Sequence, residues 1–327
     1  MTKYSIASEA DALTYELPSN IGTALVGSSG GTSSDISADG NYIAVTDDPN
    51  LLVFNASDNS LKFSVDIETA AKTIAFQNNG NLVVIGNSQS KVYPVIYDVV
   101  SELEGVALEN DGKIRGGLSR SRAVFNNTDT KVYSLTSYDY SSGWDVSTGN
   151  LLPDTTGLLS LGEYRYSAHS PTSPIMCISS KDNPFLNIFD TSTDPWTPIS
   201  LPGGEIPANF GDACCFSSDG TRFYFSVYTG SVEVYDVNGT TFTKIDTFSL
   251  SRPKTMGLST DDNYILTGTY AAPFLRVYVS STGVQITDAV PNLAETTPYC
   301  APVFNLAKPS GQLPVTKSNP LLFGQDF

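Results

Sequence analysis

The stretch "SSDGTRFYFSVYTGSVEVYDV", residues 217–237, contains a turn, an aromatic run, a second turn and an alternating run that ends near an aspartate. Asp219 and Gly220 lie between polar and apolar segments, and Asp-Gly favours a tight hairpin because glycine accepts a positive φ. The alternation at Val232 and Val234 is typical of a half-buried strand. The stretch therefore predicts consecutive antiparallel strands, and its recurrence elsewhere decides the fold.

The same strand ending recurs along the chain. A strand that ends in a bulky residue, usually followed by Asn or Asp, is found as "LLVFN" ending at Asn55, "PVIYD" at Asp98, "GWD" at Asp145, "LNIFD" at Asp190, "VEVYD" at Asp236 and "LRVYV" at Val279. Successive copies lie 43 to 47 residues apart. A period of about 45 residues is typical of a four-stranded propeller blade.

A turn motif keeps the same phase as these strand endings. It is found in "SADGNYIAV" (37–45), "QNNGNLVVI" (77–85), "NNTDTKVYSL" (126–135), "SSDGTRFYF" (217–225) and "STDDNYILT" (259–267). Each repeat then reads as an inner strand, this turn, a second strand, the strand with the recurring ending, and an outer strand such as "LKFSVDI" at 61–67. Six repeats are covered in this way.

The two ends of the sequence are expected to supply a seventh repeat. The segment 297–327 offers an inner strand, a turn at Pro309–Gly311, a second strand and "PLLF", but no outer strand. "ALTYELP" at 12–18 can supply that strand and close the ring, which removes exposed edges. We therefore predict an all-β fold, a single domain over 1–327 that forms a seven-bladed β-propeller of four-stranded antiparallel blades. The predicted blades are 32–68, 72–110, 120–155, 163–202, 211–250, 254–290, and 297–327 completed by the closing strand 12–18.

A family resemblance supports this prediction. The repeat "FSSDGTRFYFSVYTGSVEVYDVNGTTFTKI" resembles those of YVTN or lactonase-like propellers, relatives of WD40 domains, and the likeness covers nearly the whole chain. It departs from true WD40 repeats, because Trp144-Asp145 is the only Trp-Asp pair and the Gly-His dipeptide is absent. The resemblance implies a propeller but no single function, since such folds support unrelated activities. Some relatives are hydrolases or metal-dependent sugar-lactone enzymes, and no set of positions here matches their sites residue by residue.

Charge and hydropathy disfavour several classes of partner. The 327 residues include 18 Lys and Arg against 34 Asp and Glu, a formal net charge of −16, so nucleic acid is repelled at long range. No apolar stretch approaches the ~20 residues that a membrane helix needs. The start "MTKYSIASEADALTYEL" lacks a secretory signal pattern. We expect a soluble protein that is not exported by the usual route, does not insert into membranes and does not bind nucleic acid.

The chain has no persuasive catalytic motif. "VGSSGGTSS" at 26–34 is interpreted as a linker, because it lacks the lysine that phosphate transfer requires. His169, the single histidine, aligns with inner-strand core positions, so we expect it to be packed or hydrogen-bonded. Calcium at the Asp47-Asp48 turn is an alternative to ordinary solvated turn carboxylates. We predict no catalytic residue, no cofactor and no metal site.

The cysteines are expected to be structural thiols. Cys177, Cys214, Cys215 and Cys300 lack the CxxC spacing of a zinc site. Cys214 and Cys215 are neighbours inside an apolar run, where small buried thiols are ordinary and a mutual disulfide would be strained.

Alignment of the repeats places basic residues at one recurring position. The aligned inner-strand residues Phe76, His169, Phe216 and Leu258 are preceded, four residues earlier, by Lys72, Arg165, Asp212 and Lys254. In the third repeat this position falls at Ser121 or Arg122 and in the first at Thr32, while Arg120 and Arg252 lie close by in sequence.

These residues suggest an anion-binding or partner-binding rim where the inner strands begin, beside the central channel. Converging cations there can hold a carboxylate, a phosphate or an acidic partner segment. The alternative is that carboxylates between blades, Asp212 among them, neutralise the cations, or that the side chains extend into solvent.

The function expected from the sequence is a non-enzymatic interaction platform. Its acidic, Ser/Thr/Asn-rich composition resembles propellers carried as structural or host-contacting parts of bacteriophage virions, as tail or head accessory proteins. The expected partners are other virion subunits and an anionic ligand or a host surface molecule. Two alternatives are a lactonase-like hydrolase with its site at the channel mouth, and a cytoplasmic scaffold of WD40 type.

Overall fold

The computed structural model of the chain describes residues 2–7, 12–17, 23–26, 31–37, 39–47, 50–57, 60–67, 71–87, 94–109, 122–126, 128–135, 142–152, 164–193, 196–201, 207–250, 252–258, 262–269, 275–286, 303–305 and 321–322. The regular secondary structure in these ranges is all β. Within them no helix is long and apolar enough to cross a membrane.

The described strands form seven small sheets. The first contains β4 (Gly31–Ile36), β5 (Tyr42–Asp47), β6 (Asn50–Asn55) and β7 (Leu61–Asp66), with β27 (Leu321–Leu322) added beside β4. The second contains β8 (Ala71–Phe76), β9 (Leu82–Asn87), β10 (Val95–Asp98) and β11 (Leu103–Glu104), and the third contains β12 (Arg122–Phe125), β13 (Lys131–Leu135) and β14 (Ser142–Asp145).

The remaining four sheets continue in the same manner. The fourth contains β15 (Tyr164–His169), β16 (Ile175–Ser180), β17 (Leu186–Asp190) and β18 (Thr197–Ile199), and the fifth contains β19 (Cys214–Phe216), β20 (Arg222–Val227), β21 (Ser231–Asn238) and β22 (Thr241–Ser249). The sixth contains β23 (Pro253–Leu258), β24 (Tyr264–Thr269) and β25 (Leu275–Val279). The seventh has the order β2 (Ala12–Leu17), β1 (Thr2–Ala7), β3 (Thr23–Val26) and β26 (Val303–Asn305).

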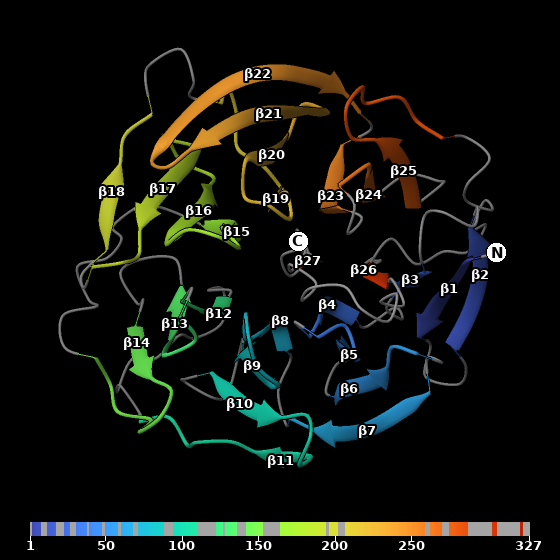
Figure 1. The fold of residues 1–327 in the computed structure, drawn as a ribbon, viewed down its shortest axis with the longest axis vertical. Helices are drawn as coiled ribbons and strands as arrows, with labels where there is room; N and C mark the ends of the chain where they lie inside the picture. The colour runs from blue at the N-terminus through green and yellow to red at the C-terminus, as the bar shows by residue number, and fades with distance from the viewer. Residues whose placement is uncertain are drawn as a thin grey trace.

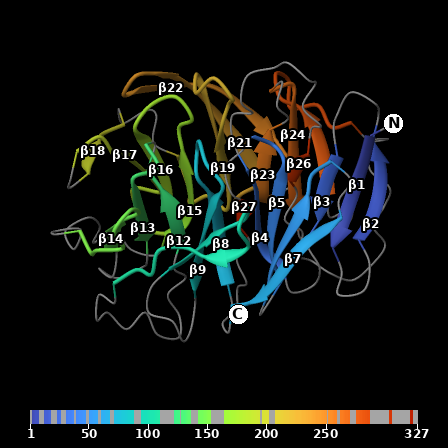
Figure 2. The same cartoon turned by 60° about the horizontal axis from the view of Figure 1, so that its bottom comes forward.

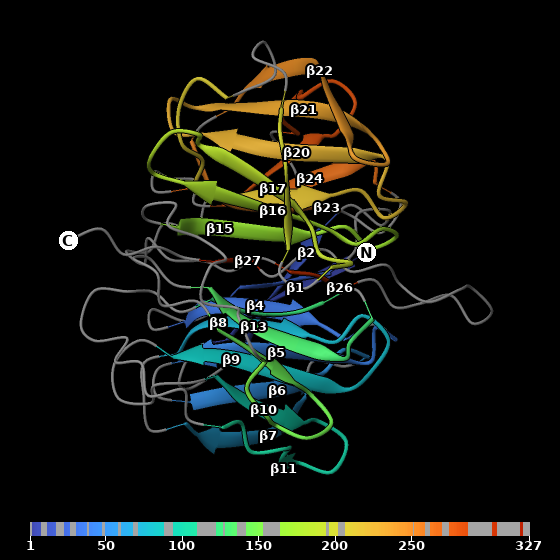
Figure 3. The same cartoon turned by 90° about the vertical axis from the view of Figure 1, so that its left-hand side faces the viewer.

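The sheets stand around a common centre, as Figure 1 shows, and the strands run mainly along the short axis of the molecule, as the side view in Figure 3 shows. We call β4, β8, β12, β15, β19 and β23 the first strands, because each begins its sheet in sequence and lies on the side of the sheet toward the centre, where only the short β27 of the first sheet lies farther in among the described strands. The fourth strands of the first, second, fourth and fifth sheets, which are β7, β11, β18 and β22, lie at the periphery.

The sequence repeat is confirmed strand by strand. The strands β6, β10, β14 and β17 end at the predicted Asn55, Asp98, Asp145 and Asp190, β25 ends at Val279, and β21 continues two residues beyond Asp236. The predicted Asp-Gly turns join the first strand to the second, with φ of 71° at Gly40 and 72° at Gly220. Such a φ favours glycine, which explains why the motif marks these turns.

Hydrophobic cores lie between neighbouring sheets. The face of the fifth sheet toward the fourth contributes Cys214, Phe216, Phe223, Phe225 and Tyr235, and the opposite face contributes Cys215, Tyr224, Val232 and Val234 to a core shared with the sixth. Equivalent cores join the first sheet to the second, the second to the third, and the third to the fourth. Both faces of a sheet are therefore buried, which explains the nearly continuous apolar runs of the second strands.

Two aspartates bind the hairpin turn of the neighbouring sheet, and we call these contacts carboxylate clasps. Asp129 accepts hydrogen bonds from the backbone N–H groups of Asn78 (2.6 Å) and Asn79 (2.7 Å). Asp262 accepts hydrogen bonds from the backbone N–H (2.9 Å) and hydroxyl (2.6 Å) of Ser218. Both aspartates have a positive φ, 60° and 57°, at the turn position that glycine holds elsewhere. Asp129 and Asp262, at the position where other turns have glycine, thus link neighbouring sheets by hydrogen bonds.

The composition of the seventh sheet differs from the prediction. Residues 12–17 do form its outermost strand, but its two middle strands, β1 and β3, also come from the N-terminal part of the sequence. Only β26, paired antiparallel with β3, comes from the C-terminal part. The "PLLF" segment, expected as the third strand of this repeat, instead places Leu321–Leu322 beside β4. The turn predicted at Pro309–Gly311 lies outside the described residues.

The interpretation of 26–34 as a linker is also wrong in part. Val26 belongs to β3, and β4 already begins at Gly31. Small and polar residues fill the first part of β4, which pairs with β5 along one edge and with the two residues of β27 along the other.

Candidate functional site

The predicted rim residues lie where the first strands begin. Lys72 and Lys254 are the second residues of β8 and β23, Arg165 is the second residue of β15, and Asp212 lies just before β19. We call positions 72, 165, 212 and 254 the inner rim. The three basic members belong to the second, fourth and sixth sheets, which alternate around the centre.

Neighbouring first strands run in the same direction, as contacts near their last residues and in the turns that follow them show. The carboxylate of Asp35, near the end of β4, accepts a hydrogen bond from the N–H of Phe76, the last residue of β8 (2.7 Å). The turn after β15 contacts the turn after β19, through the hydroxyl of Thr172 and the carbonyl of Asp219 (3.2 Å). The carboxylate clasps join two further pairs of these turns. These first strands consequently begin at the other end of the sheets, where the inner rim lies.

Each basic rim residue coincides with a β-bulge. In the second, fourth and sixth sheets the ladder between first and second strands is interrupted between Ala71 and Thr73, between Tyr164 and Tyr166, and between Pro253 and Thr255. Lys72, Arg165 and Lys254 are the residues inside these three irregularities. A bulge leaves one residue outside the ladder and re-aims its side chain, and such bulges are enriched beside functional sites. For these three residues the structure describes the backbone.

Arg122 is not equivalent to the other rim cations. Phe125 pairs with Val132 as Phe76 pairs with Val83, so the residue four positions before Phe125 is Ser121. Arg122 pairs directly with Leu135 in an unbroken ladder and therefore takes the place of Thr73, one residue past the bulge position. Ser121 and Arg120 lie outside the described residues. In the first sheet the irregularity spans Thr32 and Ser33, which are neutral.

Asp212 and Arg252 form a buried ion pair between the fifth and sixth sheets. The Asp212 carboxylate, 1% exposed, accepts hydrogen bonds from Nε (2.9 Å) and Nη2 (2.7 Å) of Arg252, whose side chain is 27% exposed. The guanidinium carbon lies 3.4 Å from the centre of the Tyr228 ring, which in turn packs on Phe210. The sequence raised the alternative that Asp212 neutralises basic residues near the rim. The structure shows this for Arg252, and the resulting ion pair joins two sheets.

Two buried serines support the rim, and sequence reasoning missed both. The hydroxyl of Ser179 accepts a hydrogen bond from the N–H of Tyr166 (3.1 Å), beside the bulge at Arg165, and donates to the carbonyl of Gly211 (2.9 Å). The hydroxyl of Ser226 accepts hydrogen bonds from the N–H groups of Asp212 (3.1 Å) and Ala213 (2.7 Å). The only signal in the sequence is a serine within an otherwise apolar second strand.

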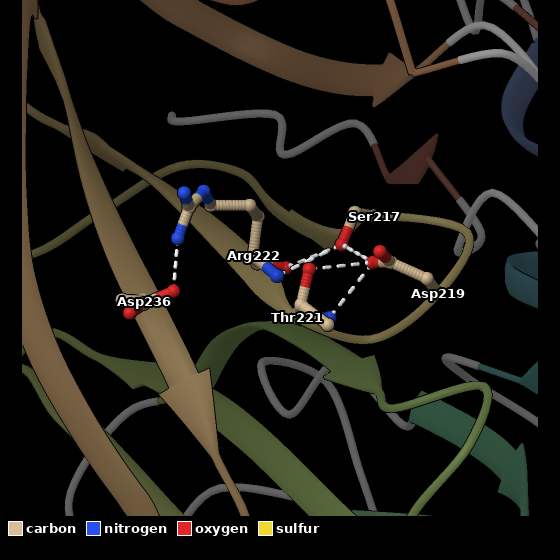
Figure 4. Close-up of polar contacts among 5 residues, drawn as sticks. All are labelled: Ser217, Asp219, Thr221, Arg222 and Asp236. Carbon is tan, nitrogen blue, oxygen red and sulfur yellow. Dashed lines mark hydrogen bonds and ion pairs between the residues drawn. The ribbon is translucent and has the colours of Figure 1, made fainter.

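The polar residues of 217–237 hold the hairpin together, as Figure 4 shows. The Asp219 carboxylate accepts hydrogen bonds from the Ser217 hydroxyl (2.7 Å) and from the N–H (2.9 Å) and hydroxyl (2.8 Å) of Thr221, and Arg222 pairs with Asp236. Burial alone would raise the pKa of Asp219, but the hydrogen bonds from Thr221 and Ser217 outweigh it and lower that pKa. This stretch is therefore part of the scaffold.

The remaining candidates for chemistry are also engaged in the scaffold. His169, the last residue of β15, has Nδ1 2.9 Å from the carbonyl of Ser170 and Nε2 3.3 Å from the Thr191 hydroxyl. Cys177, Cys214 and Cys215 are buried, and burial raises the pKa of the Cys177 and Cys215 thiols well above their usual value.

In the described part of the chain, no three His, Cys, Asp or Glu side chains are grouped in a way that would hold a metal ion. Asp48 and Cys300 lie outside that part.

Comparison with known proteins supports the fold alone. No protein-family model matches the chain, and no curated protein matches it. Among solved structures, the chain is similar to the crystal structure of a functionally unknown protein from Desulfotomaculum acetoxidans DSM 771, with a TM-score of 0.66 and 14% sequence identity. The match covers 84% of this chain and 88% of that chain. At this identity the two proteins share an arrangement of strands, and no activity follows from it.

Proposed function

We propose that the chain is a seven-bladed β-propeller that acts as a non-enzymatic binding module and receives an anionic ligand at the inner rim. The propeller proposal is supported by seven described sheets around one centre, by cores between consecutive sheets, and by first strands that run in the same direction. In propellers the beginnings or ends of the innermost strands surround a central channel.

The observation that carries the binding proposal is the coincidence of Lys72, Arg165 and Lys254 with three bulges. The chain has few basic residues and a net charge of −16, so three cations at one recurring position around the centre form a local exception. Several cations at equivalent positions around one centre favour a multivalent anion over a monovalent one. Asp212 holds the corresponding position in the fifth sheet, where its own pairing with Arg252 offsets its charge.

The carboxylates at the recurring strand ending have structural partners. Asp98, Asp145 and Asp190 each accept hydrogen bonds from the backbone of the turn that follows them. These contacts support a role for the recurring strand ending in turn formation. We therefore propose that the protein binds its ligand through the basic residues of the inner rim without catalysing a reaction, while these carboxylates stabilise the turns.

Isothermal titration calorimetry with citrate and with hexaglutamate tests the proposal. The wild-type chain is expected to bind both, more weakly as salt is added, and the triple variant Lys72→Ala, Arg165→Ala, Lys254→Ala is expected to lose at least tenfold in affinity. The matched control, Lys62→Ala, Lys131→Ala, Arg222→Ala, removes the same charge at the opposite end of the sheets, near the starts of β7, β13 and β20, and should bind as the wild type does. Equal affinities for the rim variant and the control would refute the proposal.

A further inference from the structure

The strand β27 lies inside the ring, on the centre-facing edge of β4. The first sheet has the order β27-β4-β5-β6-β7, and β27 also contacts β23 of the sixth sheet. The views in Figures 1 and 2 agree that β27 is nearer the centre than β4. A segment from the C-terminal part of the sequence therefore occupies the edge that a channel ligand would meet in the first sheet.

The register places β27 directly at the inner rim. Leu321 pairs with Ser34 and Leu322 with Ser33, so β27 lies beside the irregular part of β4. This part corresponds to the bulges that contain Lys72, Arg165 and Lys254, and Thr32 is its equivalent position. Because the pairing is antiparallel, β27 also points toward the end of the ring where the first strands begin.

The attachment of β27 is slight. It forms two residue pairs with β4, whereas β6 and β7 pair along most of their length. A single backbone hydrogen bond contributes little net stability, so a strand of two residue pairs can be displaced by a ligand that makes a longer ladder. Extended segments commonly bind exposed strand edges in this way.

We propose that β27 is an autoinhibitory strand, which occupies the centre-facing edge of β4 and is displaced when an extended acidic peptide binds at the inner rim. The peptide backbone would pair with β4, and its carboxylates would meet the three cations that β27 leaves around the centre. This inference rests on the proposed function and adds to it both a ligand class and a means of regulation.

A reversible cross-link tests the inference in the full chain. Directly opposed residues of an antiparallel pair have Cα atoms about 4.5–5.5 Å apart, which suits a disulfide, so Ser34→Cys with Leu321→Cys, in a Cys300→Ser background, can hold β27 in place. The matched control is Asn238→Cys with Thr241→Cys, a directly opposed pair at the exposed end of the β21–β22 hairpin. Hexaglutamate is the probe. The oxidised Ser34–Leu321 variant is expected to bind at least tenfold more weakly than its reduced form, while oxidation leaves the control unchanged.

Release of the strand should have the opposite effect. Leu322→Pro removes a backbone donor and disfavours the strand, and it is expected to raise hexaglutamate affinity several-fold over the wild type. Equal binding by the oxidised, reduced and Leu322→Pro forms, together with lost binding in the Lys72, Arg165 and Lys254 triple variant, would overturn the inference and leave the proposed function intact. Absence of binding in every form, Leu322→Pro included, would overturn both.

Discussion

Removal of the Arg252 guanidinium is expected to destabilise the fold without reducing anion binding. In Arg252→Ala the Asp212 carboxylate, 1% exposed, loses the hydrogen bonds from Nε and Nη2. The Tyr228 ring also loses the guanidinium stacked on it. Because both residues come from loops that precede first strands, the change acts at the junction between the fifth and sixth sheets.

The magnitude follows from the burial of the two partners. Removing one partner of a buried ion pair costs about 3–5 kcal/mol, and the Arg252 side chain is 27% exposed, so water can partly solvate the abandoned carboxylate. We therefore expect a loss at the lower end, about 3 kcal/mol, with the lost cation–π contact included in it. Asp212→Ala should cost less, about 1 kcal/mol, because the remaining guanidinium can reach water.

Urea unfolding of the single and double variants measures these values. The Asp212→Ala, Arg252→Ala double variant should be less destabilised than the sum of the singles by about 2 kcal/mol, which is the coupling of the pair. Lys181→Ala, the loss of an exposed cation, serves as control and should change the free energy of unfolding by less than about 0.5 kcal/mol. A loss in Arg252→Ala no larger than in this control, or a tenfold fall in its affinity for citrate, would refute the assignment of Arg252 to the scaffold.

Three further predictions concern the scaffold. Asp262→Ala removes a carboxylate clasp while the backbone keeps its left-handed φ, so it should lower the free energy of unfolding by about 2–3 kcal/mol. Asp262→Gly should lower it by about 1 kcal/mol less, because glycine accepts that φ. Equal losses of the two variants in urea unfolding would contradict this prediction. Hydrogen bonds from Ser147 and Thr148 lower the pKa of Asp145, and hydrogen bonds from Ser192 lower that of Asp190. The stabilisation by these two carboxylates is thus present above about pH 4 and lost as the pH falls through their lowered folded-state pKa values. Below about pH 4 the melting temperature of the Asp145→Asn, Asp190→Asn variant should therefore depend less on pH than that of the wild type. In a Cys300→Ser background the buried thiols of Cys177, Cys214 and Cys215 should react with a thiol reagent only after unfolding. Rapid labelling of the native protein would contradict the burial of these three thiols.

The repeat made most of the fold predictable. Asp219-Gly220 and the ending at Asp236 report local turn chemistry, which sequence patterns carry directly, so the hairpins and third strands were placed within one or two residues. The seventh sheet was harder, because the pairing of β3 with β26 depends on segments from opposite parts of the sequence. No periodic signal distinguishes "PLLF" as a third strand from "PLLF" as a strand beside β4.

The candidate site was predictable only in part. Counting back from Phe76 and Leu258 located Lys72 and Lys254, but the bulges that contain them are a property of the ladder. The sequence left the equivalent position open between Ser121 and Arg122, because a shift of one residue moves a side chain to the other face of a strand, and the ladder of β12 places it at Ser121. The partners of Asp212 and Asp262 lie in other sheets, and sequence spacing does not reveal such pairs. The virion setting and the hydrolase alternative stay predictions.

The pairing of β3 with β26 has a consequence for how the chain reaches its fold. The other described sheets are built from strands that follow one another in sequence, so each forms by local contacts, apart from the addition of β27 to the first. The two long-range pairings, β3 with β26 and β4 with β27, join the C-terminal strands to adjacent parts of the N-terminal segment. Long-range pairing carries the largest entropic cost of loop closure. Most of the described sheets thus form by local contacts, and until β26 pairs with β3 the edge of β3 is open to pairing with another chain.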